Sequence, residues 1–150
     1  ARDLRVISAA LKMISDMERI GDQAEDIAEI SKTIKKDSSN MYSDHIDKMT
    51  RTAISMVKES VDSFVKKDVK LANDVIIKDD VVDELFIKVK NDIINAVAED
   101  KTVGEYFVDI LMIAKYLERI SDHAVNVAEW VIFSITGEHV SEELIEKEKL

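Results

Sequence analysis

The sequence predicts an all-α protein, an antiparallel bundle of long helices. It contains no proline and only three glycines in 150 residues, so few positions interrupt regular structure. Hydrophobic residues make up 46% and charged residues 35% of the chain, a balance typical of amphipathic helices. The apolar residues recur at helical spacing in long segments that short polar segments separate.

Composition also excludes several classes of function. The formal net charge of −10 argues against a nucleic-acid binder, because such proteins need clustered lysine and arginine. The chain has no cysteine, so it has neither a disulfide, a thiolate metal site nor a cysteine nucleophile. No apolar run approaches the ~20 residues of a membrane span, and no signal-peptide pattern opens the chain. We therefore expect a soluble protein.

The first two predicted helices differ in how much of their surface is apolar. Residues 2–36 carry two adjacent apolar stripes, so this helix should be covered on two sides and lie at the centre of the bundle. Residues 37–40 predict a turn. Residues 41–66 carry a single stripe, which places the second helix on the outside.

The third and fourth helices are predicted over residues 69–98 and 103–136. Asp68 is the expected N-cap of the third helix, and Thr102 that of the fourth. Gly137 suits the position just after the fourth helix. Residues 138–150 form a short charged tail.

The chain contains an internal duplication. Residues 117–129 repeat residues 17–29 at an offset of one hundred positions, with the shared frame Glu-Arg-Ile-small-Asp-x-Ala-x-(Asp/Asn)-(Ile/Val)-Ala-Glu. In the first copy Glu18, Asp22 and Asp26 fall within about 80° of one another on a helical wheel, and Glu25 and Glu29 fall close by. These acids continue the apolar stripe, where a neighbouring helix should pack. A cation is therefore needed to offset their repulsion.

Further acids belong to the same pattern. Glu118 and Asp122 repeat the pair in the second copy, and Asp79 and Asp83 lie about 40° apart on the apolar face of the third helix. Carboxylates without cysteine suit Mg²⁺, Mn²⁺, Ca²⁺ or carboxylate-bridged iron. Glycine and serine occupy the third position after the two glutamates, where the usual di-iron frame has histidine, so oxygen-activating di-iron chemistry is not expected.

Simpler explanations remain open beside the metal site. A single such acid pair is most often a solvated face, and a ladder in which Arg19 and Arg119 neutralise the acids would need no metal. We expect His123 to lie on the helix flank rather than act as a ligand, and His45 and His139 to be isolated and exposed.

The doubled Glu-Arg-Ile-Gly/Ser-Asp motif, with Asp-Leu-Arg at residues 3–5 and Asp-Asp-Val-Val-Asp-Glu-Leu at residues 79–85, resembles the signature of the PhoU family. The resemblance covers nearly all of the chain and implies a protein built from three-helix repeats. It implies a cytoplasmic accessory protein that negatively regulates phosphate uptake, not an enzyme, and that acts with the ATPase of the phosphate ABC transporter and a sensor histidine kinase. It also implies metal ions, iron or zinc foremost with manganese or magnesium as alternatives.

Transferred by motif, the resemblance assigns the metal ligands. They are Glu18, Asp22, Asp79, Asp83, Glu118 and Asp122, with Asp26 as a weaker candidate because the family usually has asparagine there.

The resemblance also predicts the domain organisation. Residues 1–37 correspond to the third helix of a first repeat whose first two helices are absent here, residues 38–137 to a complete second repeat, and residues 138–150 to the tail. The uncovered stripe of the first helix then predicts a homodimer, a helix-exchanged oligomer, or a fragment whose missing helices are supplied elsewhere. A metal-dependent hydrolase or phosphatase that uses the same acids is the alternative function, although no nucleophile motif or phosphate-binding glycine loop supports it.

Overall fold

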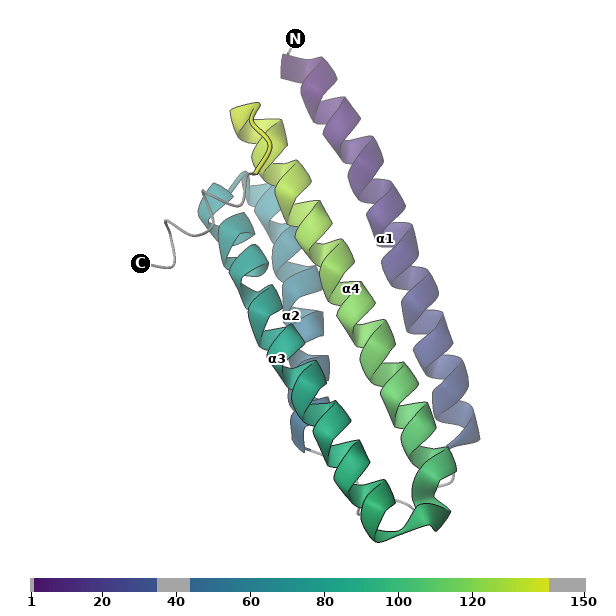
Figure 1. The fold of residues 1–150 in the computed structure, drawn as a ribbon. Coiled ribbons are helices and arrows are strands. Elements are labelled where there is room, and N and C mark those ends of the chain that lie inside the picture. The colour runs from purple at the N-terminus through teal and green to yellow at the C-terminus, as the bar shows by residue number, and fades with distance from the viewer. Residues whose placement is uncertain (1, 35–43, 141–150) are drawn as a thin grey trace.

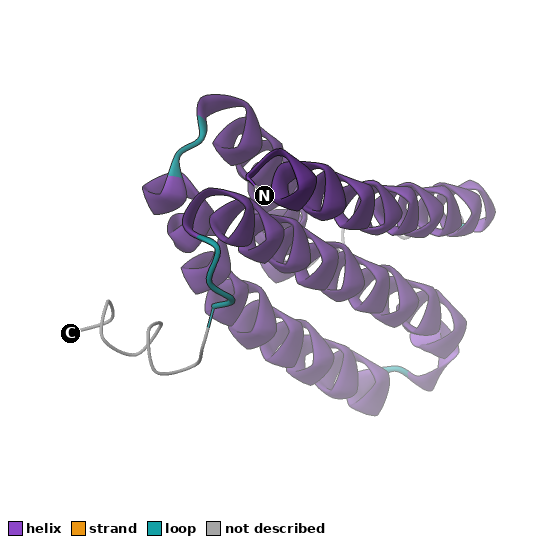
Figure 2. Cartoon of the chain, turned by 90° about the horizontal axis from the view of Figure 1, so that it is seen from above, coloured by secondary structure: helices purple, strands orange, loops and turns teal. Residues whose placement is uncertain are grey.

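The computed structural model describes residues 2–34 and 44–140, and every regular element in them is helical (Figures 1 and 2). The long helices are α1 (Arg2–Thr33), α2 (Asp44–Lys66), α3 (Val69–Glu99) and α4 (Gly104–Thr136), and a short 3₁₀ helix, η2 (Lys101–Val103), precedes α4. The predicted all-α class is confirmed. None of the helices in these residues has the length and apolarity that a membrane span requires.

Helix α4 is the centre of the bundle. It packs against α1, α2 and α3, whereas α2 and α3 pack against each other and against α4 (Figure 1). Helix α1 lies along the side of α4 away from α3 and packs mainly against α4. The prediction that the first helix lies at the centre is therefore wrong for the described residues.

The core forms where α2, α3 and α4 meet, and the single stripe predicted for the second helix is confirmed. Met49, Ala53 and Met56 of α2 are almost completely buried at a spacing of three or four residues. They pack with Val75, Val82, Leu85 and Val89 of α3 and with Ala114, Ala124, Val127, Ala128 and Val131 of α4. Because α4 has neighbours on three sides, it needs the two apolar stripes that its sequence carries.

Helix α1 shows what happens when only one of two apolar stripes has a neighbour. Only Ala9 and Met13 are buried on this helix. Leu4 and Leu11, on the other stripe, are 72% and 63% exposed. No described part of the chain packs against this second stripe. Helix α1 therefore has a neighbour on one side and lies at the edge of the bundle.

Two of the three predicted helix caps are confirmed. Asp68 accepts a hydrogen bond from the backbone N–H of Leu71 at 3.0 Å, and Gly137 has a φ of 83° and donates its N–H to the Phe133 carbonyl. The prediction for Thr102 is wrong: Val103 is the N-cap of α4 and has no side-chain cap bond. Asp100 instead accepts hydrogen bonds from the backbone N–H and the hydroxyl of Thr102. It is the N-cap of η2, which forms the turn between α3 and α4.

The start of α1, the end of α2 and both ends of α3 and α4 lie close to the predicted residues. Residues 35–43, which hold the predicted end of the first helix, the turn and the start of the second, lie outside the described residues, as do residues 141–150 of the tail.

Candidate metal centre

Four carboxylates of α3 and α4 lie near enough to one another for their charges to interact. Asp79 and Asp83 lie one turn apart on α3, and Glu118 and Asp122 lie one turn apart on the facing side of α4. We call these four residues the α3–α4 acid cluster. Asp79 and Glu118 are half-buried, whereas Asp83 and Asp122 remain exposed.

Burial and mutual repulsion perturb the acids of this cluster. Burial raises the pKa of Asp79 from its ordinary 3.8 to about 7, and the charges of Asp83, Asp122, Asp80 and Glu118 add to the effect in that order. Desolvation followed by the charge of Glu118 also raises the pKa values of Asp83 and Asp122. The cluster thus has an excess of negative charge, which a bound cation would offset.

Two further details define the cluster. The Oδ1 atom of Asp79 is buried and has no hydrogen-bond partner among the described residues. Lys115 forms an ion pair with Glu118, and its Nζ atom lies 5.4 Å from the centroid of the Phe86 ring. One cation from the chain therefore offsets four carboxylates only in part.

The donor set fits a metal ion, because an unpaired buried carboxylate oxygen and neighbouring acids are what hard cations prefer. As the side chains lie, however, no group of three or more histidine, aspartate or glutamate residues within residues 2–34 and 44–140 is arranged to hold a metal ion. The carboxylate of Glu118 is paired with the ammonium group of Lys115 instead of with the other acids of the cluster. The cluster has the charge and the oxygens for a metal site, without a closed coordination shell.

The acids of the first copy lie elsewhere. Glu18 and Asp22 are exposed and Asp26 is half-buried. The residues of α1 that meet α4, such as Ala9 and Asp16, lie about 160–180° around the helix from Glu18. The first acid pair therefore points away from α4, and no described helix covers it.

The structure corrects the prediction that His45 and His139 are isolated. His45 is not isolated, since its Nδ1 lies 2.7 Å from Oδ2 of Asp92 across the α2–α3 contact. His139 is exposed but stacks on the Phe133 ring at a centroid distance of 4.3 Å. His123 lies on the flank as predicted, and its Nδ1 donates to Oδ1 of Asp16 at 2.8 Å.

The arginine ladder, the alternative to a metal site, is not present in the described part of the chain. No ion pair there involves Arg19 or Arg119, and Arg119 lies over the Tyr116 ring at 5.8 Å. The acids of both copies are therefore not neutralised by these two arginines.

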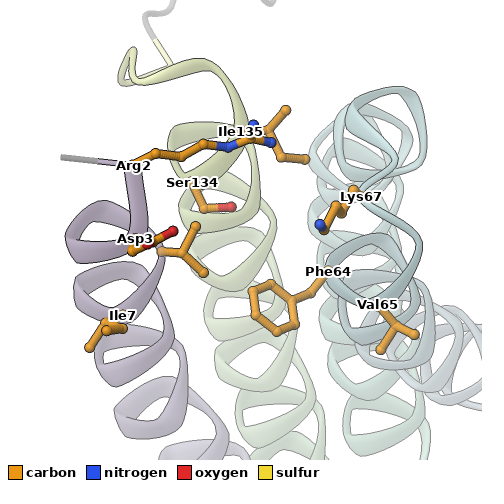
Figure 3. Close-up of a pocket in the computed structure, with 9 residues that line it drawn as sticks. Arg2, Asp3, Ile7, Phe64, Val65, Lys67, Ser134 and Ile135 are labelled. Carbon is orange, nitrogen blue, oxygen red and sulfur yellow. The ribbon is translucent and has the colours of Figure 1, made fainter.

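A cleft of about 700 Å³ opens at the end of the bundle where α1 begins and where α2 and α4 end (Figure 3). Its walls include Ile7, Phe64, Val65 and Ile135, with Arg2, Asp3 and Lys67 at the edge. None of the predicted metal ligands lines it. The cleft is therefore separate from the α3–α4 acid cluster.

Comparison with known proteins identifies the family. The PhoU domain model matches residues 1–31 and 46–131 of this chain. A PhoU homolog of the phosphate-specific transport system in Aquifex aeolicus is 40% identical over 149 residues, which are 99% of this chain and 67% of that protein. The chain belongs to the PhoU family.

Other PhoU-family proteins agree. The phosphate-specific transport system accessory protein PhoU homolog of Clostridium acetobutylicum is 37% identical over 140 residues, 93% of this chain and 64% of its own length. The crystal structure of PhoU from Pseudomonas aeruginosa has a TM-score of 0.83 at 30% identity and covers 92% of this chain and 66% of that one. PhoU from Streptococcus pneumoniae, the phosphate transport system regulatory protein, shows the same fold with a TM-score of 0.85 at 24% identity. The chain thus spans about two-thirds of the length of these relatives.

Family membership bears on the chemistry expected of the acids. The PhoU family is known to bind metal ions, and its members are accessory and regulatory proteins rather than enzymes. The non-enzymatic prediction is confirmed at the level of the family, and the hydrolase alternative loses its support.

Proposed function

We propose that this protein is a metal-binding, non-enzymatic regulator of phosphate uptake that restrains the phosphate ABC transporter and phosphate-regulon signalling. Family membership supports the regulatory role, since the relatives carry the names of accessory proteins of phosphate-specific transport. The observation that carries metal binding is the unpaired, buried Oδ1 of Asp79 within a group of four acids.

In this proposal Asp79, Asp83, Glu118 and Asp122 hold one metal site between α3 and α4. Iron or zinc is the expected metal because of the resemblance to the PhoU family, and manganese or magnesium are the alternatives, which an all-carboxylate donor set also suits. Bound metal would remove the repulsion between the acids and so stabilise the α3–α4 contact, in proportion to its affinity and concentration.

The acids of the first copy are proposed as a second site. Glu18, Asp22 and the weaker candidate Asp26 have no described helix opposite them, so their partner carboxylates must come from outside the described residues. This fits the proposed organisation, in which residues 1–37 end a first repeat, residues 38–137 form a second repeat and residues 138–150 form a tail. The match of the PhoU domain model to two separate segments supports that division.

The partners follow from the same family. We propose that the protein acts in the cytoplasm, on the ATPase of the phosphate ABC transporter and on a phosphate-sensing histidine kinase. A regulator of this kind works through surfaces that contact its partners and needs no nucleophile.

Elemental analysis of protein purified without chelator or a metal-affinity column tests metal binding. Wild type is compared with the Glu118→Ala/Asp122→Ala double variant and with Asp80→Ala/Glu84→Ala, a control that removes two exposed acids of α3. We expect iron or zinc in wild type and in the control, and a loss of most of that metal in the first variant. Equal metal content in all three proteins, or none in wild type, would refute the proposed site.

A further inference from the structure

The cleft at the end of the bundle is built mainly from apolar side chains. Ile7 of α1 and Val65 of α2 are 58% and 72% exposed, and the half-buried side chains of Phe64 and Ile135 complete the wall. Large apolar side chains that are open to water at a concave surface are typical of a binding site. The volume of about 700 Å³ is also within the ~300–1,000 Å³ of small-molecule sites.

Two cations lie at the edge of this cleft. Figure 3 shows the Arg2 side chain extending from the start of α1 across the end of α4, and the Lys67 side chain extending from the end of α2 toward the same space. In the described part of the chain neither side chain forms an ion pair, whereas the neighbouring Lys66 pairs with Asp62 at 3.0 Å. Asp3 is the one acid among the described residues that line the cleft. The edge is therefore positive in a chain whose formal net charge is −10.

The backbone conformation of Lys67 also points to a role for its side chain. Lys67 has a φ of 54°, and among the described residues it is the only one besides glycine with a positive φ. Glycine is the usual residue in this left-handed conformation at a helix end, because a Cβ is strained there. A lysine at this position costs stability, which a role of its charge at the cleft would explain.

The apolar wall and the positive edge together select the chemistry of a ligand. Hydrocarbon gains free energy when it covers the wall, and the two cations attract an anionic group. A bare inorganic anion would use only the edge, and Ser134 in the wall already donates its hydroxyl to the Val131 carbonyl. A nucleic acid needs more clustered cations than two. An extended peptide would leave its backbone groups unpaired, because the helical walls pair their own.

We propose that this cleft binds a small amphipathic anion, with its hydrocarbon chain between Ile7 and Phe64 and its carboxylate or phosphate head between Arg2 and Lys67. A free fatty acid and a chain of an anionic membrane lipid present this same chemistry. The site shares no residue with the α3–α4 acid cluster, so the proposal does not depend on metal binding.

Titration of decanoate into the full chain, below the micelle concentration of decanoate and at one fixed pH, tests the site. Decanoate should bind at least about tenfold more tightly than decyltrimethylammonium, which has a similar chain and the opposite charge. Acetate, which has the charge without the chain, should not bind. The amide NMR signals of Phe64 and Ile135 should shift with decanoate, because both residues line the cleft.

The variant Lys67→Gly separates binding from stability. It should raise the melting temperature, because glycine relieves the left-handed backbone, and weaken decanoate binding about threefold, because one cation is lost. Arg2→Gln should weaken binding by a similar factor, and Asp3→Asn should strengthen it. Lys66→Gln is the matched control, since it removes a neighbouring cation that does not line the cleft, and its decanoate affinity should equal that of wild type.

Flotation with phosphatidylglycerol vesicles, beside phosphatidylcholine vesicles, identifies the source of the ligand. Binding to phosphatidylglycerol that Lys67→Gly weakens assigns the site to a membrane lipid, and binding of decanoate without binding to vesicles assigns it to a free amphiphile. Binding of neither overturns the proposal. So does an unchanged decanoate affinity in both Lys67→Gly and Arg2→Gln, or equal binding of decanoate and decyltrimethylammonium.

Discussion

Replacing Asp79 by asparagine should make the metal-free protein more stable at neutral and alkaline pH. A carboxyl whose pKa is raised in the folded state binds its proton more tightly there than in the unfolded chain, so folding stability falls as pH rises from about 4 to about 7. A rise in pKa from 3.8 to about 7 corresponds to at most about 4 kcal/mol. Because the cluster is open to solvent at Asp83 and Asp122, screening reduces the expected gain to about 1–2 kcal/mol.

Urea unfolding followed by circular dichroism at pH 5 and pH 8, with chelator present, measures this effect. Wild type should lose stability between the two pH values, whereas Asp79→Asn should lose less, and the difference should be largest at pH 8. Asp80→Asn is the control, because Asp80 is the exposed neighbour on the same helix. If the stability of Asp79→Asn falls with pH as steeply as that of wild type, Asp79 is not the carboxyl whose raised pKa causes the loss of stability.

Three further predictions concern other parts of the molecule. Gly137→Ala should cost about 1–2 kcal/mol in urea unfolding, because the residue has a φ of 83° and a guanidinium lies 2.3 Å from the added Cβ, whereas Gly104→Ala meets nothing within 4 Å and should be neutral or stabilising. Lys115→Met should tighten Mn²⁺ binding about threefold, since it removes a positive charge from the acid cluster; Arg119→Met should not, and a weaker affinity for the lysine variant would contradict the electrostatic argument. The 150-residue chain should be a dimer in light scattering and Leu11→Glu a monomer, because Leu11 is 63% exposed on the uncovered stripe; a monomeric wild type would end that prediction.

The helical pattern of the sequence was sufficient to predict the fold and the helix face on which several of the acids lie. Apolar spacing located the four long helices, and the wheel positions of Asp79 and Asp83 placed them on the apolar face of the third helix; the pairing with the acids of the fourth helix came from the resemblance to the PhoU family. These features depend on one helix at a time, or on which face of it is apolar. Such information is local, so periodicity carries it.

Features that depend on two helices at once could not be predicted. The contact of Asp16 with His123 and Asn126 requires the register of α1 against α4, which no single helix specifies. The wrong prediction for the position of the first helix has a related cause. Its second apolar stripe requires a neighbouring helix, but the stripe does not show whether that helix belongs to the described part of this chain. The prediction that Thr102 caps α4 was wrong because a short 3₁₀ helix precedes α4. The capping bond there is made by Asp100, at the start of that 3₁₀ helix.

The antiparallel packing of α1 against α4 also shows how the two copies of the repeated motif have diverged. In a symmetric dimer of identical units every contact across the axis would occur twice. Here the bonds of Asp16 occur once, because its counterpart is Tyr116 and the counterparts of His123 and Asn126 are Gln23 and Asp26. The phenol, amide and carboxylate at these counterpart positions do not provide two donors for one acid. The copies are therefore no longer interchangeable, and a gene in which either half was replaced by a duplicate of the other would encode a bundle without this contact.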